Sequence, residues 1–204
     1  MDELGAPTAF DQIGERYDDT FHDRSAQITA GGWLIDLLPE GARVLDHGCG
    51  SARPTAEQLT QAGLEVTGVD ESERMLELAR ERVPDATFVR QDLRDFDGLG
   101  KFDAVTSFFA LLMLPRSDIA ATLAGLHRLL PTGGPLALSM VEGDLDWVEI
   151  PFLGTPIHVS AYPAEQLSEV VQQAGFDVVD MDSMDVETAP GRSEQQLFLR
   201  ALAR

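Results

Sequence analysis

One segment decides the fold class of this chain: Val44-Leu45-Asp46-His47-Gly48-Cys49-Gly50-Ser51-Ala52-Arg53-Pro54. An apolar run ends in an acid and is followed by a Gly-x-Gly turn and by residues that can start a helix. Glycine has no Cβ, so this turn can adopt positive φ and let the backbone approach a bound molecule closely. We expect a buried strand to lead here into a helix that begins near Ser51, with Pro54 close to its first position. The unpaired N–H groups at the start of that helix would face a ligand.

Strand and helix patterns alternate after residue 40. Apolar residues at helical spacing, such as Met75, Leu78 and Ala79, separate the strand-like runs. This alternation is typical of an α/β fold, with a doubly wound, mostly parallel sheet that binds its ligand at the carboxyl ends of the strands. Two late apolar stretches, Phe176–Met181 and Gln196–Leu202, predict a C-terminal antiparallel hairpin at the sheet edge. The expected parallel strands are Arg43–Asp46, Glu65–Asp70, Thr87–Gln91, Phe102–Phe108 and Pro135–Val141.

The third position of the glycine turn separates two classes of ligand. The dinucleotide fingerprint requires glycine at position 53, and this chain has Arg53 there. The stretch Asp46–Ala52 instead resembles the first motif of the class I S-adenosylmethionine (SAM)-dependent methyltransferases, which reads roughly D-x-G-C-G-x-G, and departs from it only at Ala52. The turn Pro131-Thr132-Gly133-Gly134 is similar to the same family's L-x-P-G-G element. The resemblance implies a seven-stranded, Rossmann-like sheet and SAM as the cofactor.

The resemblance also implies a cofactor-binding set. Asp46 and the turn Gly48-Cys49-Gly50 would lie at the methionine half of SAM. Asp70 would accept both ribose hydroxyls, and its alternative role is an N-cap, for which the adjacent Glu71 and Ser72 are better placed. Asp92 would bond the adenine amino group, with a turn-starting role as the alternative. The other expected contacts are the backbone of Leu93, the side chains of Glu71, Met75 and Phe108, and Tyr17 as a lid residue or an ordinary surface tyrosine.

The chain divides into three parts within one expected domain, 1–204. Residues 1–40 predict an amphipathic helical cap, residues 41–141 the cofactor-binding core, and residues 142–204 a substrate-side segment followed by the hairpin. Within 142–162 we see little periodicity. The apolar residues expected on the buried side of the cap are Ile28, Trp33, Leu34, Leu37 and Leu38.

We expect the acceptor to bind between the cap and residues 142–162. Aromatic and apolar residues in this part of the fold would line a pocket for a small organic molecule. His158 and His22 are candidates for a general base, and a structural role is the alternative for each. The acids Glu142, Asp144 and Asp146 would attract a cationic acceptor or face water. The expected lining residues are Phe109, Met113, Trp147, Phe152 and Tyr162.

Composition restricts the classes of partner. The net charge of −20, from 15 basic and 35 acidic residues, disfavours nucleic acids and anionic membranes. Cys49 is the single cysteine, which suits a reducing cytoplasm, and in the turn it is expected to be a packing residue. The four histidines show no metal-binding spacing, so no metal is expected. We expect a cytoplasmic monomer or homodimer with a small-molecule acceptor.

These observations predict methyl transfer from SAM to a nucleophilic O, N or C of a small organic acceptor, by in-line SN2 displacement. Two alternatives stay open at this point. The first is a SAM-binding protein that transfers no methyl group, such as a cyclase or a regulatory binder. The second is a nucleotide-cofactor oxidoreductase, against which Arg53 counts.

Overall fold

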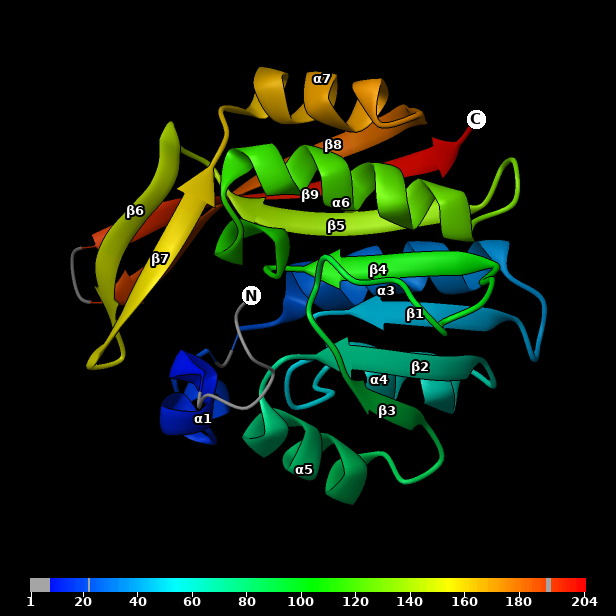
Figure 1. The fold of residues 1–204 in the computed structure, drawn as a ribbon, viewed down its shortest axis with the longest axis horizontal. Coiled ribbons are helices and arrows are strands. Elements are labelled where there is room, and N and C mark those ends of the chain that lie inside the picture. Colours follow the sequence, from blue (N-terminus) through cyan, green and yellow to red (C-terminus); the bar gives the residue numbers. More distant parts are fainter. Residues whose placement is uncertain (1–7, 22, 190–191) are drawn as a thin grey trace.

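A seven-stranded sheet forms the centre of the computed structural model, which describes residues 8–21, 23–189 and 192–204. The strand order is β3-β2-β1-β4-β5-β9-β8 (Figure 1). The first five strands run parallel, whereas β9 runs antiparallel to both of its neighbours, β5 and β8. This arrangement confirms the predicted fold class. The strands are β1 (Arg43–His47), β2 (Glu65–Asp70), β3 (Thr87–Arg90), β4 (Ala104–Phe108), β5 (Pro135–Val141), β8 (Phe176–Ala189) and β9 (Arg192–Ala203).

Helices cover both faces of this sheet, each over its own apolar core. One core gathers the buried side chains of α6 and α7, such as Leu123 and Leu167, against the sheet. The other gathers those of α3, α4 and α5, such as Leu34, Leu59 and Leu76. The helices are α1 (Ala9–Ile13), α2 (Arg16–Thr20), α3 (Ser25–Leu37), α4 (Thr55–Gln61), α5 (Glu73–Arg82), the 3₁₀ turn η1 (Leu111–Met113), α6 (Arg116–Leu129) and α7 (Ala164–Gln173).

The helix after the glycine turn starts later than predicted. We expected it near Ser51, but α4 begins at Thr55. Ala52 has φ of 70° and therefore lies outside the helical region, so the chain completes a turn before the helix can form. The backbone N–H of Ala52 donates to Cys49 O, which closes that turn.

The predicted apolar face of the cap is partly wrong. Leu34 is buried, but Ile28 and Leu37 are 45% and 52% exposed. The buried stripe of α3 runs through Gln27, Ala30, Gly31 and Leu34 at helical spacing, because this stripe faces α4 and the sheet. Trp33 and Leu38 lie at its margin and are partly buried.

The sequence showed little periodicity in residues 142–162, but the structure shows that this segment is regular. It contains a two-stranded antiparallel hairpin, β6 (Leu145–Phe152) and β7 (Thr155–Ala161), which stands apart from the main sheet at the left of Figure 1. Leu153 and Gly154 join the strands with φ of 49° and 81°. Positive φ at both central residues is the geometry of a tight hairpin turn. The C-terminal hairpin is also longer than predicted, since β8 extends to Ala189 and β9 begins at Arg192.

The part of the cap that contains α1 lies with the β6–β7 hairpin at the edge of the sheet where β1, β2 and β4 end, whereas α3 covers a face of the sheet (Figure 1). Asp18 ties the cap to this edge, because its Oδ2 accepts hydrogen bonds from the Ser51 hydroxyl at 2.7 Å and from Arg82 Nη1 at 2.6 Å. No helix in the part of the chain that the structure describes has the length and apolarity that crossing a bilayer requires.

Candidate functional site

Two adjoining cavities open at the carboxyl ends of the parallel strands. The larger, of about 390 Å³, is lined by the glycine turn and by the ends of β2 and β3, and we call it the turn cavity. The smaller, of about 190 Å³, is lined by the β6–β7 hairpin, η1, α3 and the inner face of the β8–β9 hairpin, and we call it the hairpin cavity. The residues that line both are Phe10, Tyr17, Arg24, Gln27, Phe109 and Met113.

Glycine is required in the turn for conformation and for space. Gly48 has φ of 76°, and a Cβ placed on it would lie 2.2 Å from Ala110 Cβ. Gly50 has φ of 50°, but a Cβ on it would meet no atom within 4 Å. The turn therefore packs tightly against Ala110 at Gly48, whereas at Gly50 it faces open space. Backbone exposed to a cavity in this way allows close approach of a ligand.

Asp70 lies at the end of β2 with both carboxylate oxygens engaged by backbone. Oδ2 accepts from the Gly50 N–H and Oδ1 from the Ser72 N–H, both at 2.9 Å. Burial raises the pKa of this carboxyl. Asp70 lines the turn cavity, and each of its oxygens, with one backbone donor, keeps acceptor capacity for a further hydroxyl. The N-cap of α5 is Ser72, whose hydroxyl accepts from the Met75 N–H, so the alternative role proposed for Asp70 belongs to its neighbour.

The end of β3 places a carboxylate beside a backbone donor. Asp92 is held by Arg94, whose Nε and Nη2 lie 2.8 and 2.5 Å from its two oxygens, and this pairing lowers the pKa of Asp92. The Leu93 N–H donates to Glu71 Oε1 at 3.3 Å, and burial raises the pKa of Glu71. An acceptor and a donor side by side match the edge of a heteroaromatic base with an amino group.

Asp46, Cys49 and His47 support the turn from within the core. Asp46 is buried behind the turn and lines neither cavity; its Oδ1 accepts from Thr106, its Oδ2 has no hydrogen-bond partner, and burial raises its pKa to about 7. Burial also raises the pKa of the Cys49 thiol, which packs as a neutral side chain. Burial lowers the pKa of His47 to about 4, and its two ring nitrogens bond Ser107 and Leu93 O.

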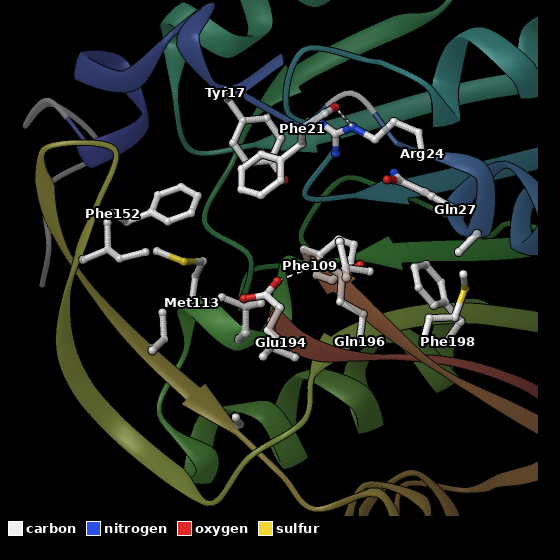
Figure 2. Close-up of a pocket in the computed structure, with 18 of the residues that line it drawn as sticks. Tyr17, Phe21, Arg24, Gln27, Phe109, Met113, Phe152, Glu194, Gln196 and Phe198 are labelled. Atoms are coloured by element: carbon white, nitrogen blue, oxygen red, sulfur yellow. Dashed lines mark hydrogen bonds between the residues drawn. The ribbon is translucent and has the colours of Figure 1, made fainter. Parts of the chain in front are cut away.

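An aromatic cluster closes the hairpin cavity. The ring centroid of Phe152, on β6, lies 6.4, 6.3 and 5.9 Å from those of Phe10, Tyr17 and Phe21 in the cap. Arg16 adds a hydrogen bond from its guanidinium to Leu153 O at 3.1 Å. Figure 2 shows the rings of Tyr17, Phe21 and Phe152 on one side of this cavity. Cap and hairpin, which are far apart in the sequence, therefore meet at this cavity.

The C-terminal hairpin supplies lining residues that the sequence did not suggest. Glu194, Gln196 and Phe198 alternate along β9 and face the hairpin cavity, as Figure 2 shows. Gln196 Nε2 donates to Glu194 Oε1 at 2.8 Å. Their spacing of two residues indicates that the three side chains lie on one face of a strand. Only the observed length of β9 shows that this face extends as far as the cavity. The other lining residues not foreseen include Phe10, Phe21, Arg24, Gln27, Met184 and Val186.

The structure separates the residues expected at the acceptor site. Phe109 and Met113 line both cavities, Phe152 the hairpin cavity and Trp147 the turn cavity. Tyr162 lines neither cavity, because its ring packs under the Arg116 guanidinium. The ring centre lies 4.3 Å from Arg116 Cζ. Tyr17, Met75, Asp92, Leu93 and Phe108, expected at the cofactor, all line the turn cavity.

Of the two candidate bases, one lies away from both cavities, and the other is not among the residues that the structure describes. His158 lines neither cavity; its ring stacks on Trp147 with centroids 5.0 Å apart, and Nε2 lies 4.0 Å from Glu149. His22 falls outside the residues that the structure describes. Within those residues no group of three His, Cys, Asp or Glu side chains is arranged to hold a metal ion.

The turn cavity fits SAM. The open face of Gly50 and the remaining lone pairs of Asp70 offer unfilled hydrogen-bonding capacity along one wall. Arg24 lines the same cavity, where its Nη2 has no hydrogen-bond partner among the described residues and lies 3.7 Å from Asp18 Oδ1. These groups match the polar ends of the cofactor.

Comparison with known proteins agrees with this fit. Residues 44–134 match the profile of a methyltransferase domain. The chain is 33% identical over 151 residues to an uncharacterized methyltransferase of Synechocystis sp., with 70% of each chain covered.

Solved structures share the fold. The 1,6-didemethyltoxoflavin-N1-methyltransferase of Burkholderia thailandensis, with S-adenosylhomocysteine bound, superposes with a TM-score of 0.71 at 26% identity, covering 95% of this chain and 85% of that one. The [4+2]-cyclase SpnF superposes with a TM-score of 0.69 at 18% identity, and the match covers 97% of each chain. At this identity the likeness shows the fold alone. The chain therefore belongs to the class I SAM-dependent methyltransferases, and S-adenosylmethionine is its cofactor.

Proposed function

We propose that this methyltransferase methylates a nucleophilic O, N or C atom of a small organic acceptor that binds in the hairpin cavity. The observation that carries the proposal is the junction of the two cavities, where six side chains line both. A molecule in the hairpin cavity would thus lie directly beside a cofactor in the turn cavity. The apolar walls and the volume of about 190 Å³ suit a small molecule with a ring.

The cofactor would be held by residues of the turn cavity. Gly48, Cys49 and Gly50 would contact its methionine half, with Asp46 supporting the turn from behind. Asp70 would accept the ribose hydroxyls, and Asp92 with the Leu93 backbone would bind the adenine. The surrounding contacts would come from Tyr17, Glu71, Met75 and Phe108.

Bound SAM supplies a methyl group on a sulfonium, which is already a strong electrophile. The protein therefore has to align the acceptor in line with the methyl group and exclude water. Alignment alone can contribute ~7–11 kcal/mol to lowering the barrier. Phe109 and Met113, which line both cavities, would orient the acceptor, and the aromatic cluster around Phe152 would exclude water. A general base is optional in this chemistry.

The relatives support a small acceptor. The Burkholderia thailandensis enzyme is described as binding 1,6-didemethyltoxoflavin, a small molecule. The fold is also shared by a cyclase, so binding of SAM without methyl transfer is the competing function. The oxidoreductase alternative has no support from the relatives, which are methyltransferases.

A screen with methyl-labelled SAM tests the proposal. The protein is incubated with pools of small ring compounds that carry hydroxyl, amine or activated carbon nucleophiles, and labelled products are counted. We expect label transfer to at least one class, together with SAM binding by calorimetry. SAM binding without transfer to any pool would favour the cyclase or regulatory alternative. The Gly48→Ala variant, which should not bind SAM, controls for label released without catalysis.

A further inference from the structure

We infer that the acceptor carries a protonated amine remote from the atom that is methylated, and that Glu194 binds this ammonium and so determines specificity. The inference rests on the proposed function, because it assigns the molecule that would occupy the hairpin cavity. The observations behind it are the charges of the cavity, its aromatic rings and an unpaired amide oxygen at the junction.

The charged residues that line the hairpin cavity are Asp23, Arg24 and Glu194. Arg24 is already engaged: its guanidinium lies 5.0 Å from the centre of the Tyr17 ring and 3.7 Å from Asp18 Oδ1. Asp23 accepts from the N–H and hydroxyl of Ser25 at the exposed rim. Among the residues that the structure describes, the inner charge of the cavity for which no ion pair is found is therefore the carboxylate of Glu194.

Glu194 is oriented but not neutralised. Its Oε1 accepts from Gln196 Nε2 at 2.8 Å, which directs the carboxylate toward the cavity interior (Figure 2). An amide donor leaves the negative charge in place. The carboxylate thus keeps acceptor capacity for the N–H groups of a ligand, and a charge-assisted hydrogen bond is stronger than a neutral one.

The walls also favour a cation. The Arg24 guanidinium already lies over the rings of Tyr17 and Phe21, at 5.0 and 5.5 Å from their centres. The other aromatic residues that line the cavity are Phe10, Phe109, Phe152 and Phe198. The faces of aromatic rings attract ammonium groups, more strongly where water is excluded. An anionic acceptor would gain nothing from these rings and would be repelled by Glu194.

Gln27 is an independent sign that a donor-bearing ligand binds. Gln27 is 9% exposed and lines both cavities. Its Nε2 donates to Thr55 Oγ1 at 2.8 Å, and its Oε1 has no partner among the residues that the structure describes. A buried acceptor without a partner is costly, and a ligand N–H or O–H at the junction would remove that cost.

The position of Glu194 separates recognition from chemistry. Glu194 lines the hairpin cavity and not the turn cavity. The ammonium that it binds has no lone pair for attack and stays remote from the cofactor, while the nucleophilic atom lies at the junction beside Phe109 and Met113. The net charge of −20 would also raise the local concentration of a cationic acceptor.

Three probes with one ring system test the inference: 2-naphthylmethylamine, 2-naphthylmethanol and 2-naphthoate. Their dissociation constants are measured by calorimetry on protein saturated with S-adenosylhomocysteine, at neutral pH. We expect the amine to bind at least tenfold more tightly than the alcohol, and the carboxylate to bind most weakly. High salt should weaken only the amine appreciably. Equal or tighter binding of the carboxylate, or no binding of any probe, would overturn the inference.

Glu194→Gln keeps the size of the side chain and removes its charge. We expect it to weaken amine binding about tenfold or more, to change alcohol binding less than about threefold, and to leave affinity for S-adenosylhomocysteine unchanged. Asp185→Asn is the matched control, since it removes a carboxylate from an exposed position of β8 that does not line the cavity. An amine preference that survives Glu194→Gln would remove Glu194 from this role. Failure of the parent to bind S-adenosylhomocysteine would instead count against the proposed function.

Discussion

The turn cavity and the hairpin cavity are built by different means. The turn cavity is made largely by short segments that follow the parallel strands, and its polar groups are backbone N–H groups and carboxylates near Gly50, Asp70 and Leu93. The hairpin cavity is made by side chains from the cap, α3, η1 and two hairpins. Substitutions at the turn cavity should therefore affect the cofactor, and those at the hairpin cavity should affect the acceptor alone.

The largest expected effect is that of Gly48→Ala. The left-handed backbone would cost about 1–2 kcal/mol, and the clash with Ala110 would add about 1–3 kcal/mol. We expect measurable SAM binding to be lost in calorimetry and the melting temperature to fall. Gly133→Ala is the control, because Gly133 has φ of +81° but a Cβ there meets nothing within 4 Å. Parent-like SAM binding by Gly48→Ala would show that the turn does not depend on close packing.

The next effect is a pH dependence of stability set by Asp46. Burial raises the pKa of its carboxyl from 3.8 to about 7, so the folded state holds the proton more tightly than the unfolded state. Its contribution to stability is therefore complete below about pH 4 and is lost as the pH rises through 7. Asn cannot titrate. The free energy of unfolding of Asp46→Asn should therefore rise relative to that of the parent as the pH increases over this range, by up to about 4 kcal/mol, at about 1.4 kcal/mol per pKa unit. Urea unfolding at several pH values measures the difference, and a constant difference would contradict the assignment.

Asp70→Asn tests the ribose contact. Loss of charge-assisted hydrogen bonds, each ~1.5–3 kcal/mol, should weaken SAM binding about tenfold to a hundredfold. Asp92→Asn should cost only severalfold, because one bond to the adenine is at stake and Arg94 already occupies the carboxylate. Calorimetric titration of both variants with SAM gives the comparison. Parent-like affinity in both would reduce these acids to capping and turn-forming roles.

Phe152→Ala tests the role of the hairpin cavity. It removes three aromatic contacts, each ~0.5–1.5 kcal/mol, and opens the hairpin cavity to water. We expect KM for the acceptor to rise about tenfold while the SAM dissociation constant stays within about twofold. Val148→Ala, on the same strand and 40% exposed, should change neither. Equal losses for cofactor and acceptor would show that the two cavities do not act separately.

His158→Ala should have the smallest effect. His158 lines neither cavity, and its ring stacks on Trp147, which lines the turn cavity. We expect unchanged SAM affinity and a turnover within about twofold of the parent, measured in single-turnover reactions. A general base would supply roughly 10²–10⁴-fold. A loss of that size, larger for a hydroxyl acceptor than for a neutral amine, would restore His158 as a base.

The difference between the cavities also explains what could be predicted. The first five strands and the C-terminal hairpin were predicted to within a few residues at most ends, because strand and helix periodicities are local. The same holds for Asp70 and Asp92, since a residue at the end of a parallel strand necessarily lies at the ligand edge. The β6–β7 hairpin was missed because its exposed acids and apolar residues do not alternate regularly around the irregularity between Leu145 and Val148.

The sequence by itself determined the α/β fold, the glycine turn and the acids of the cofactor site, because each depends on the conformation of a few consecutive residues. Only the tertiary structure decided that Phe152 meets the cap, that Glu194 reaches the hairpin cavity and that His158 and Tyr162 do not. These placements depend on hairpin length, on twist and on how separate elements pack against one another, which no local pattern in one sequence specifies.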